Sequence, residues 1–440
     1  MAVRAGSEQV ERPKVASALG ERVRSARRQL GLSQAQVAGD ELTKGFISQL
    51  ESGLVRPSIR SLQLIAGRLG KPLDYFIGDE PLAAGKRLEF HRLAAESAAE
   101  QRDWTEVRRS VEVALEQAPG PMEKAHLLLL AARAENAFHN HERTFEIVSE
   151  ALGLADVSTA PAVAAELLFV RGTAYGELGQ LVAATEALES ARDLLERHEV
   201  MDPRLRSRIV ASLGTAYRRL NRTSKAVTAY QEALAAASRS SELAAAARIL
   251  MGIAATHYDS GEMDAAVATY RRALGLFRQV ADLDFELGAM QSIADVQYDM
   301  GDIAGAKVSA QRAMDRALEV SDAHWAAVTE IILARVALTE GRAADALRMS
   351  KHAEQVLATT DDKIERANSL GAIAAAQEAL GKHGEADRFY RRSIDLYTSI
   401  GDFADRSGMA AEYARVLRAR GEVDKAFEML ELARGTAARS

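Results

Sequence analysis

The sequence predicts an all-α protein in which a short, non-repeating N-terminal domain precedes a long array of helical repeats. A glycine or asparagine recurs seven times, the last five steps being 40 residues each, and an alanine follows each of them five residues later. The first 80 residues do not share this period. A fixed period of this length is typical of an α-solenoid rather than of a fold with an enclosed active site. The recurring residues are Gly179, Asn221, Gly261, Gly301, Gly341, Gly381 and Gly421.

Composition narrows the class of protein further. A chain of 440 residues is too long for one compact core, so at least two units are expected. There is no cysteine, which excludes disulfides and cysteine-ligated zinc and favours a reducing compartment. No apolar run reaches the roughly 18 residues of a membrane span, and the first residues lack the apolar segment of a secretion signal. We therefore expect a cytoplasmic protein without a membrane partner.

Charge is distributed unevenly along the chain. Residues 1–80 carry a net charge of +3 and the remaining residues carry −9, which gives the −6 of the whole chain. This distribution is typical of a protein whose basic N-terminal domain binds phosphate groups and whose acidic remainder does not bind a polyanion.

Five short helices are predicted in the N-terminal domain. The second and third have clear N-caps, Ser33 and Thr43, and the glycines Gly31 and Gly53 end the first and third helices. The short turn between the second and third helices is the spacing of a helix-turn-helix. The expected ranges are 18–30, 34–39, 44–52, 58–70 and 73–77.

The third of these helices has two faces of different chemistry. Ile47 and Leu50 point into a small core, and at 100° per residue Gly45 and Gln49 lie on the opposite face, where a DNA major groove would be. Glutamine can bond an adenine edge bidentately. Phe46 has two interpretations, a DNA contact or the edge of the core. The predicted DNA-binding residues are Gln34, Thr43, Lys44, Gly45, Phe46, Ser48, Gln49 and Arg56.

The same segment carries a family resemblance. Ser33-Gln34, ISQLESG over 47–53, Pro57-Ser58 and LDYF over 73–76 fall at the spacings of the XRE (Cro/repressor-type) helix-turn-helix family. The resemblance implies that Gln34 binds backbone phosphate and that Arg27 and Glu51 form a partly buried, structural ion pair. A longer segment before Thr43, AGDEL, departs from the family and predicts a slightly extended turn.

The repeats resemble a second family. With each recurring glycine or asparagine taken as position 15 of a two-helix unit, position 8 is glycine or alanine and position 20 is always alanine. Position 24 is tyrosine in three repeats. This pattern is similar to that of tetratricopeptide (TPR) repeats, whereas HEAT repeats share the length but do not require this internal spacing. Two degenerate units precede the regular seven, so about nine repeats are expected, curled into a superhelix with a concave groove.

In such units, positions 2, 5, 9 and 12 of the first helix face the groove. A peptide could use arginine for its carboxylate, aspartate for its amine and tyrosine for its side chains; a solvated groove is the alternative. The predicted effector-binding residues are Arg208, Arg218, Arg248, Tyr258, Gln291, Asp295, Tyr298 and Arg335.

Enzyme chemistry is not indicated. No strand–glycine-rich loop–helix unit appears, and no pair of histidines four residues apart suggests a metal site. We expect no catalytic residue, no metal and no cofactor.

A Cro/repressor-type head joined to a TPR array resembles the RNPP family of peptide-sensing bacterial regulators. The resemblance implies a transcription regulator that acts as a homodimer on a twofold-symmetric site in double-stranded DNA and responds to a peptide in its TPR groove. RNPP sensors line that groove with asparagines, whereas Asn368 is almost the only one at a groove position here, so another effector is an alternative. A further alternative is a TPR scaffold that binds a protein partner and whose head contributes little.

These inferences predict four segments. They are a flexible tail (1–16), a DNA-binding head (17–80), a linker (81–87) and a TPR array for sensing and dimerisation (88–440).

Overall fold

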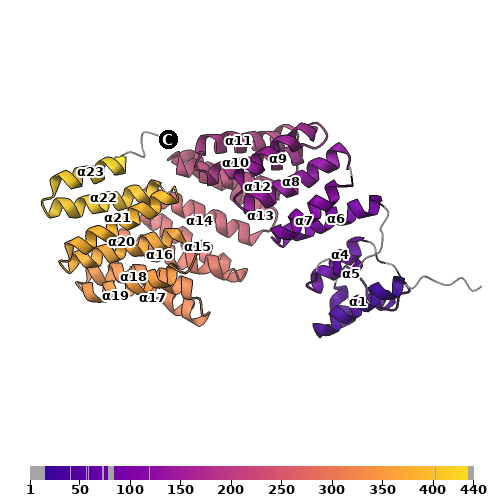
Figure 1. The fold of residues 1–440 in the computed structure, drawn as a ribbon, viewed down its shortest axis with the longest axis horizontal. Coiled ribbons are helices and arrows are strands. Elements are labelled where there is room, and N and C mark those ends of the chain that lie inside the picture. Colours follow the sequence, from indigo (N-terminus) through magenta and orange to yellow (C-terminus); the bar gives the residue numbers. More distant parts are fainter. Residues whose placement is uncertain are drawn as a thin grey trace, which may run out of the picture. The chain divides into compact units, whose positions relative to one another are not determined.

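The computed structural model describes residues 15–39, 41–55, 57, 59–71, 74–77, 84–117, 119–401 and 403–434. These residues form helices and no strand, as the sequence predicted. The chain divides into two compact units, Met1–Ala174 and Tyr175–Ser440, and most of their helices are labelled in Figure 1. Among the helices described here, none is both long and apolar enough to cross a membrane.

The first unit begins with the five helices predicted for the head. Val23, Ile47 and Leu50, from the first and third of them, are fully buried in one small apolar core. The helices are α1 (Val15–Gln29), α2 (Gln34–Ala38), α3 (Lys44–Glu51), α4 (Ile59–Arg68) and α5 (Asp74–Ile77).

Two predicted segment boundaries, those of the tail and of the linker, differ from the helix starts in the structure. Helix α1 begins at Val15, inside the predicted tail, of which residues 1–14 lie outside the described residues. Helix α6 (Ala84–Glu100) begins inside the predicted linker, of which residues 81–83 lie outside them. The apolar residue Phe90 on α6 joins the core of the head, so this helix has packing partners that a linker would lack.

In the described part of the chain, nine consecutive helix pairs follow the head, in agreement with the expected repeat number. The helices after α6 are α7 (Trp104–Leu115), α8 (Pro121–Ala137), α9 (His141–Leu154), α10 (Pro161–Glu177), α11 (Leu181–Arg197), α12 (Pro203–Arg219), α13 (Thr223–Arg239), α14 (Leu243–Asp259), α15 (Met263–Gln279), α16 (Leu283–Asp299), α17 (Ile303–Glu319), α18 (Ala323–Thr339), α19 (Ala343–Leu357), α20 (Lys363–Ala379), α21 (His383–Ser399), α22 (Phe403–Ala419) and α23 (Val423–Arg434).

The recurring residues of the sequence have local structural causes. The glycine or asparagine at position 15 ends the first helix of its pair in the left-handed region, with φ between 56° and 86° in all seven repeats. Glycine adopts this conformation without strain and asparagine tolerates it. The alanines at position 20, from Ala184 to Ala426, are buried where the second helix crosses the first. A larger side chain would hold the two helices apart.

Candidate functional sites

Helix α3 has an exposed polar face and, on its opposite side, a buried apolar face. Ile47 and Leu50 are fully buried, whereas Lys44, Gly45 and Gln49 are exposed. The Thr43 hydroxyl accepts a hydrogen bond from the Phe46 amide at 3.1 Å and so caps the helix. The capped start leaves the exposed face of the first turn open to solvent.

The other predicted DNA-binding residues have different surroundings. Phe46 packs against the head core, which favours the core-edge interpretation. Ser48 is half-buried, and its carbonyl accepts a hydrogen bond from the Ser52 hydroxyl at 2.7 Å. Arg56 lies outside the described residues.

A carboxylate network fixes α3 against α1 and α2. Arg27 donates two hydrogen bonds to the Glu51 carboxylate, at 2.6 and 2.9 Å. Gln34 Nε2 donates to the same group at 2.9 Å, and Arg24 donates to the Glu51 carbonyl at 2.9 Å. The predicted phosphate-binding amide of Gln34 is therefore engaged inside the head. Burial alone would raise the pKa of Glu51, but the hydrogen bonds from Arg27 and Gln34 hold this pKa below its usual value.

Gly20, which the sequence analysis did not single out, permits this packing of α3 against α1. A Cβ built on Gly20 of α1 would lie 2.4 Å from the Leu50 carbonyl oxygen of α3. Only glycine allows the two backbones to approach so closely. Gly20 thus fixes where α3 sits.

In the second unit, three hydrogen bonds of one kind connect successive repeats. Each joins position 12 of one repeat to position 13 of the next, 41 residues later. Arg218 pairs with Asp259 at 2.8 Å, the Tyr258 hydroxyl donates to Asp299 at 2.6 Å, and the Tyr298 and Thr339 hydroxyls are 3.0 Å apart. We call these six residues the inter-repeat ladder.

Arg335 joins two rungs of the ladder. Its guanidinium donates to Asp299 at 2.7 Å and to Asp295 at 3.2 Å, and it lies over the Tyr298 ring, 4.1 Å from the centroid. Gln291 donates to the other oxygen of Asp295 at 3.2 Å. Six of the eight predicted effector-binding residues are therefore in the ladder or in the contacts that Arg335 and Gln291 make beside it.

The remaining two predicted residues are not among these contacts. Arg248 is 4.0 Å from Asp282 and lies over the Phe285 ring. Arg208 is exposed on α12. The sequence places each groove residue by its position within a single repeat. It does not predict contacts between neighbouring repeats, such as that of Tyr298 with Thr339.

Two carboxyl groups near the ladder have raised pKa values. Burial among the helices raises the pKa of Asp295 to about 6, against the opposing charge of Arg335 and with a smaller contribution from the nearby Asp299. Burial likewise raises the pKa of Glu365 on α20 to about 7, with a contribution from Asp295 and against a hydrogen bond from Asn368. Although surrounded by protein, the Asp295 side chain retains 37% of its exposure. A cationic group could therefore reach it from solvent.

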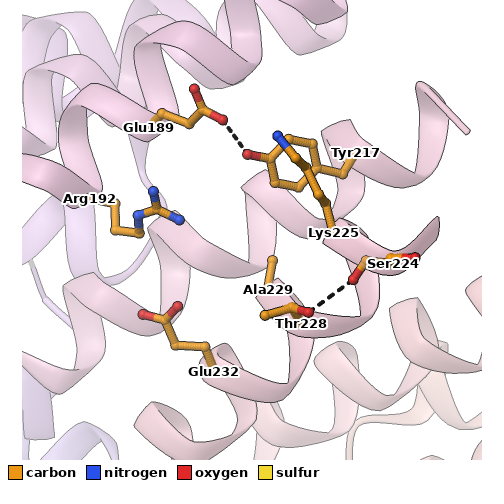
Figure 2. Close-up of a pocket in the computed structure, with 8 residues that line it drawn as sticks. All are labelled: Glu189, Arg192, Tyr217, Ser224, Lys225, Thr228, Ala229 and Glu232. Atoms are coloured by element: carbon orange, nitrogen blue, oxygen red, sulfur yellow. Dashed lines mark hydrogen bonds between the residues drawn. The ribbon is translucent and has the colours of Figure 1, made fainter. Parts of the chain in front are cut away.

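A separate cavity of about 380 Å³ lies between α11, α12 and α13, and no predicted site residue lines it (Figure 2). Its two acids are already engaged. Glu189 accepts a hydrogen bond from the Tyr217 hydroxyl, and Glu232 accepts one from Arg206 at 2.8 Å. Lys225 lies over the Tyr217 ring, and Arg192 Nε has no hydrogen-bond acceptor among the described residues. Burial and the contact with Glu189 raise the pKa of Tyr217 to about 12. Charged side chains of both signs therefore line this cavity.

Comparisons with known proteins agree with this architecture. Residues 23–76 match the family model described as helix-turn-helix, and residues 165–378 match the MalT-like TPR region. The immunity repressor protein of Bacillus phage phi105 is 25% identical over 95 residues, which are 21% of this chain and 65% of the length of the repressor.

The chain joins an XRE-type helix-turn-helix domain to a TPR array. Two solved structures share the fold of most of it. The apo form of RapI is 14% identical, with a TM-score of 0.60 over 81% of this chain and 98% of its own. The apo form of the quorum sensor NprR from B. thuringiensis is 12% identical, with a TM-score of 0.58 over 80% of this chain and 99% of its own. The TPR array thus has the fold of these two proteins.

Proposed function

We propose that this protein is a sequence-specific DNA-binding transcription regulator that acts as a homodimer. One observation carries the proposal: α3 holds Lys44, Gly45 and Gln49 in solvent while Ile47 and Leu50 anchor the helix in the core. A helix anchored in this way can enter the major groove and read base edges. The matched helix-turn-helix and TPR families are DNA-binding and interaction domains rather than enzymes. The relative from phage phi105 is named as a repressor, which supports the same function.

The TPR array is proposed to bind an effector at the inter-repeat ladder. Every ladder group is already paired within the chain, so a ligand must replace these contacts with its own. Because the rungs join successive repeats, replacing them would change how the repeats stack. A shift in stacking is a means of changing the separation of two heads in a dimer. Half-sites one turn apart require the heads to be about 34–36 Å apart.

The acidic array also suits a second candidate, a scaffold that binds a protein partner without help from the head. The two candidates differ in their DNA binding. Specific binding through phosphate contacts falls steeply between about 50 and 200 mM salt, because condensed counterions are released on binding. A scaffold would show no such specific binding.

The deciding experiment is recovery and sequencing of sheared DNA from the source genome after incubation with the purified protein. The regulator proposal expects a few sharp peaks that share a twofold-symmetric motif. Uniform recovery, both with and without a cell extract that could supply the effector, would contradict it and favour the scaffold.

A further inference from the structure

The guanidinium of Arg68, the last residue of α4, lies at the end of α2. Arg68 Nη1 donates a hydrogen bond to the Val37 carbonyl oxygen at 3.0 Å and another to the Ala38 carbonyl oxygen. Both carbonyls belong to the last turn of α2, where a helix has no internal donor for its carbonyl groups and carries a partial negative charge. Arg68 is therefore a cationic cap for α2 that comes from 30 residues further along the chain.

The segment AGDEL (38–42), which departs from the XRE family, contacts the same side chain. Gly39 has φ 53° and ψ −151°, a backbone conformation that glycine adopts freely and that strains other residues. A Cβ built on Gly39 would overlap the Arg68 guanidinium, so the glycine also leaves the space that this group occupies. The Glu41 carboxylate pairs with Arg68 Nη2. The guanidinium thus contacts both α2 and the turn that follows it.

This turn leads directly to α3. The Leu42 amide, within the turn, donates a hydrogen bond to the last carbonyl of α2 at 3.1 Å, and the next residue, Thr43, is the N-cap of α3. Helix α4, which carries Arg68, is anchored in the head core by the buried residues Leu62 and Ile65. Because the core holds α4 and the guanidinium on α4 holds the turn, Arg68 ties the start of α3 to the core of the head.

We propose that Arg68 is a positioning residue for DNA recognition, which sets where the exposed first turn of α3, with Lys44 and Gly45, meets the bases. The inference rests on the DNA-binding regulator proposed above and adds a residue that acts through α3. Hydrogen bonds weaken steeply outside a narrow range of distance and angle, and sequence is read through hydrogen bonds to base edges. A displaced α3 therefore loses discrimination between bases, whereas its attraction to phosphates, which carries no sequence information, is kept.

The test compares the affinity of the full chain for the recovered operator with its affinity for a non-specific duplex of equal length, by fluorescence anisotropy at several salt concentrations. Arg68→Met keeps the length of the side chain and removes its donors. Operator affinity is expected to fall on the order of tenfold, with non-specific affinity and the salt dependence unchanged. An unchanged ratio of the two affinities would overturn the proposal. A salt slope smaller by about 0.9 would also overturn it, because Arg68 would then contact a phosphate directly.

Hydrogen exchange of the free protein separates positioning from folding without DNA. In Arg68→Met, the amides of the turn and of the first turn of α3, those of Leu42 and Phe46 among them, should exchange on the order of tenfold faster, while the α1 amides keep their protection. An equal loss of protection in α1 would show that Arg68 only stabilises the head, and would overturn the proposal. Arg68→Lys retains a cation and its donors, and should recover part of the lost operator preference.

Two further variants test the cause. Arg28→Met removes the same charge from the exposed last turn of α1 and should leave the ratio of affinities unchanged; an equal loss there would show that net charge, and not the cap, is responsible. Gly39→Ala places a methyl group where the guanidinium lies and should lower the ratio as Arg68→Met does. Absence of specific binding in wild type would contradict the regulator itself, whereas specific binding that both variants retain would contradict the role of Arg68 alone.

Discussion

The Tyr258 hydroxyl donates a 2.6 Å hydrogen bond to Asp299, which lies 41 residues later and in the next repeat. The pair repeats the relation of Arg218 to Asp259 and precedes that of Tyr298 to Thr339. Contacts between repeats determine how a solenoid stacks, because each repeat touches only its neighbours. The ladder therefore connects the proposed effector site to the stacking of the array.

Removing a single hydrogen bond of the inter-repeat ladder should destabilise the TPR array, and more so where the acceptor is a charged carboxylate. Tyr258→Phe loses a hydrogen bond to a carboxylate and should cost about 1.5–3 kcal/mol, whereas Tyr298→Phe loses one to a hydroxyl and should cost about 0.5–1.5 kcal/mol. Urea unfolding of both variants measures the difference. Equal or negligible losses would show that water replaces the rungs without cost.

The raised pKa of Glu365 predicts a pH-dependent stability. Its folded value, about 7, exceeds the ordinary 4.5, so the folded state binds more protons between these values and stability falls as pH rises through that window. Glu365→Gln removes the buried charge and should raise the Tm at pH 8, by about 2–4 °C per kcal/mol gained, with no gain near pH 4.5. The exposed Glu385, also in the first turn of its helix, provides the control Glu385→Gln. A gain that is the same at both pH values would contradict the assignment.

Gly252 should be intolerant of a side chain. A Cβ built there would lie 2.5 Å from the Tyr230 ring, whereas one at Gly275 on α15 meets nothing within 4 Å. Gly252→Ala should therefore destabilise by about 1–3 kcal/mol, although alanine is the better helix former. Gly275→Ala, also inside a helix, should be neutral or stabilising by up to about 1 kcal/mol. Thermal unfolding compares them, and a stabilised Gly252→Ala would mean that Tyr230 moves aside freely.

Glu51 should be required for the head to fold. Glu51→Ala leaves the Arg27 guanidinium and the Gln34 amide without their shared acceptor in a buried site, which should cost about 3–5 kcal/mol. Because the folded pKa of Glu51 lies below its ordinary value, this stabilisation is fully present at pH values above 4.5. It is lost as the pH falls through the lower pKa of the folded state. Hydrogen exchange of the α1 and α3 amides reports on the head separately from the array. Unchanged protection in Glu51→Ala would refute the requirement.

Gln49 should contribute to base recognition and not to folding, since it is exposed on α3. Gln49→Ala should weaken binding to the recovered operator by about 1–3 kcal/mol and relax its preference at one base pair. Gln29→Ala, at the exposed end of α1, is the matched control and should leave affinity unchanged. Fluorescence anisotropy at fixed salt measures both. An unaltered preference in Gln49→Ala would remove this residue from the readout.

Local chemistry allowed much of the fold to be predicted from the sequence. Gly261 and its equivalents recur because the turn inside each repeat needs a positive φ, and Ala266 and its equivalents because two helices cross there. Both causes act within one repeat, so they leave a periodic pattern. The caps Ser33 and Thr43 likewise act within three residues, and they allowed the starts of α2 and α3 to be predicted.

Only the tertiary structure decided which of the candidate residues meet. The sequence by itself determined a helix-turn-helix head, a 40-residue helical repeat and the register that places Tyr258 and Arg335 on first helices. It did not determine that Tyr258 reaches Asp299 or that Gln34 is held by Glu51. These relations depend on how one repeat or helix packs on another, and the geometry of packing between elements leaves no periodic signal in a single chain.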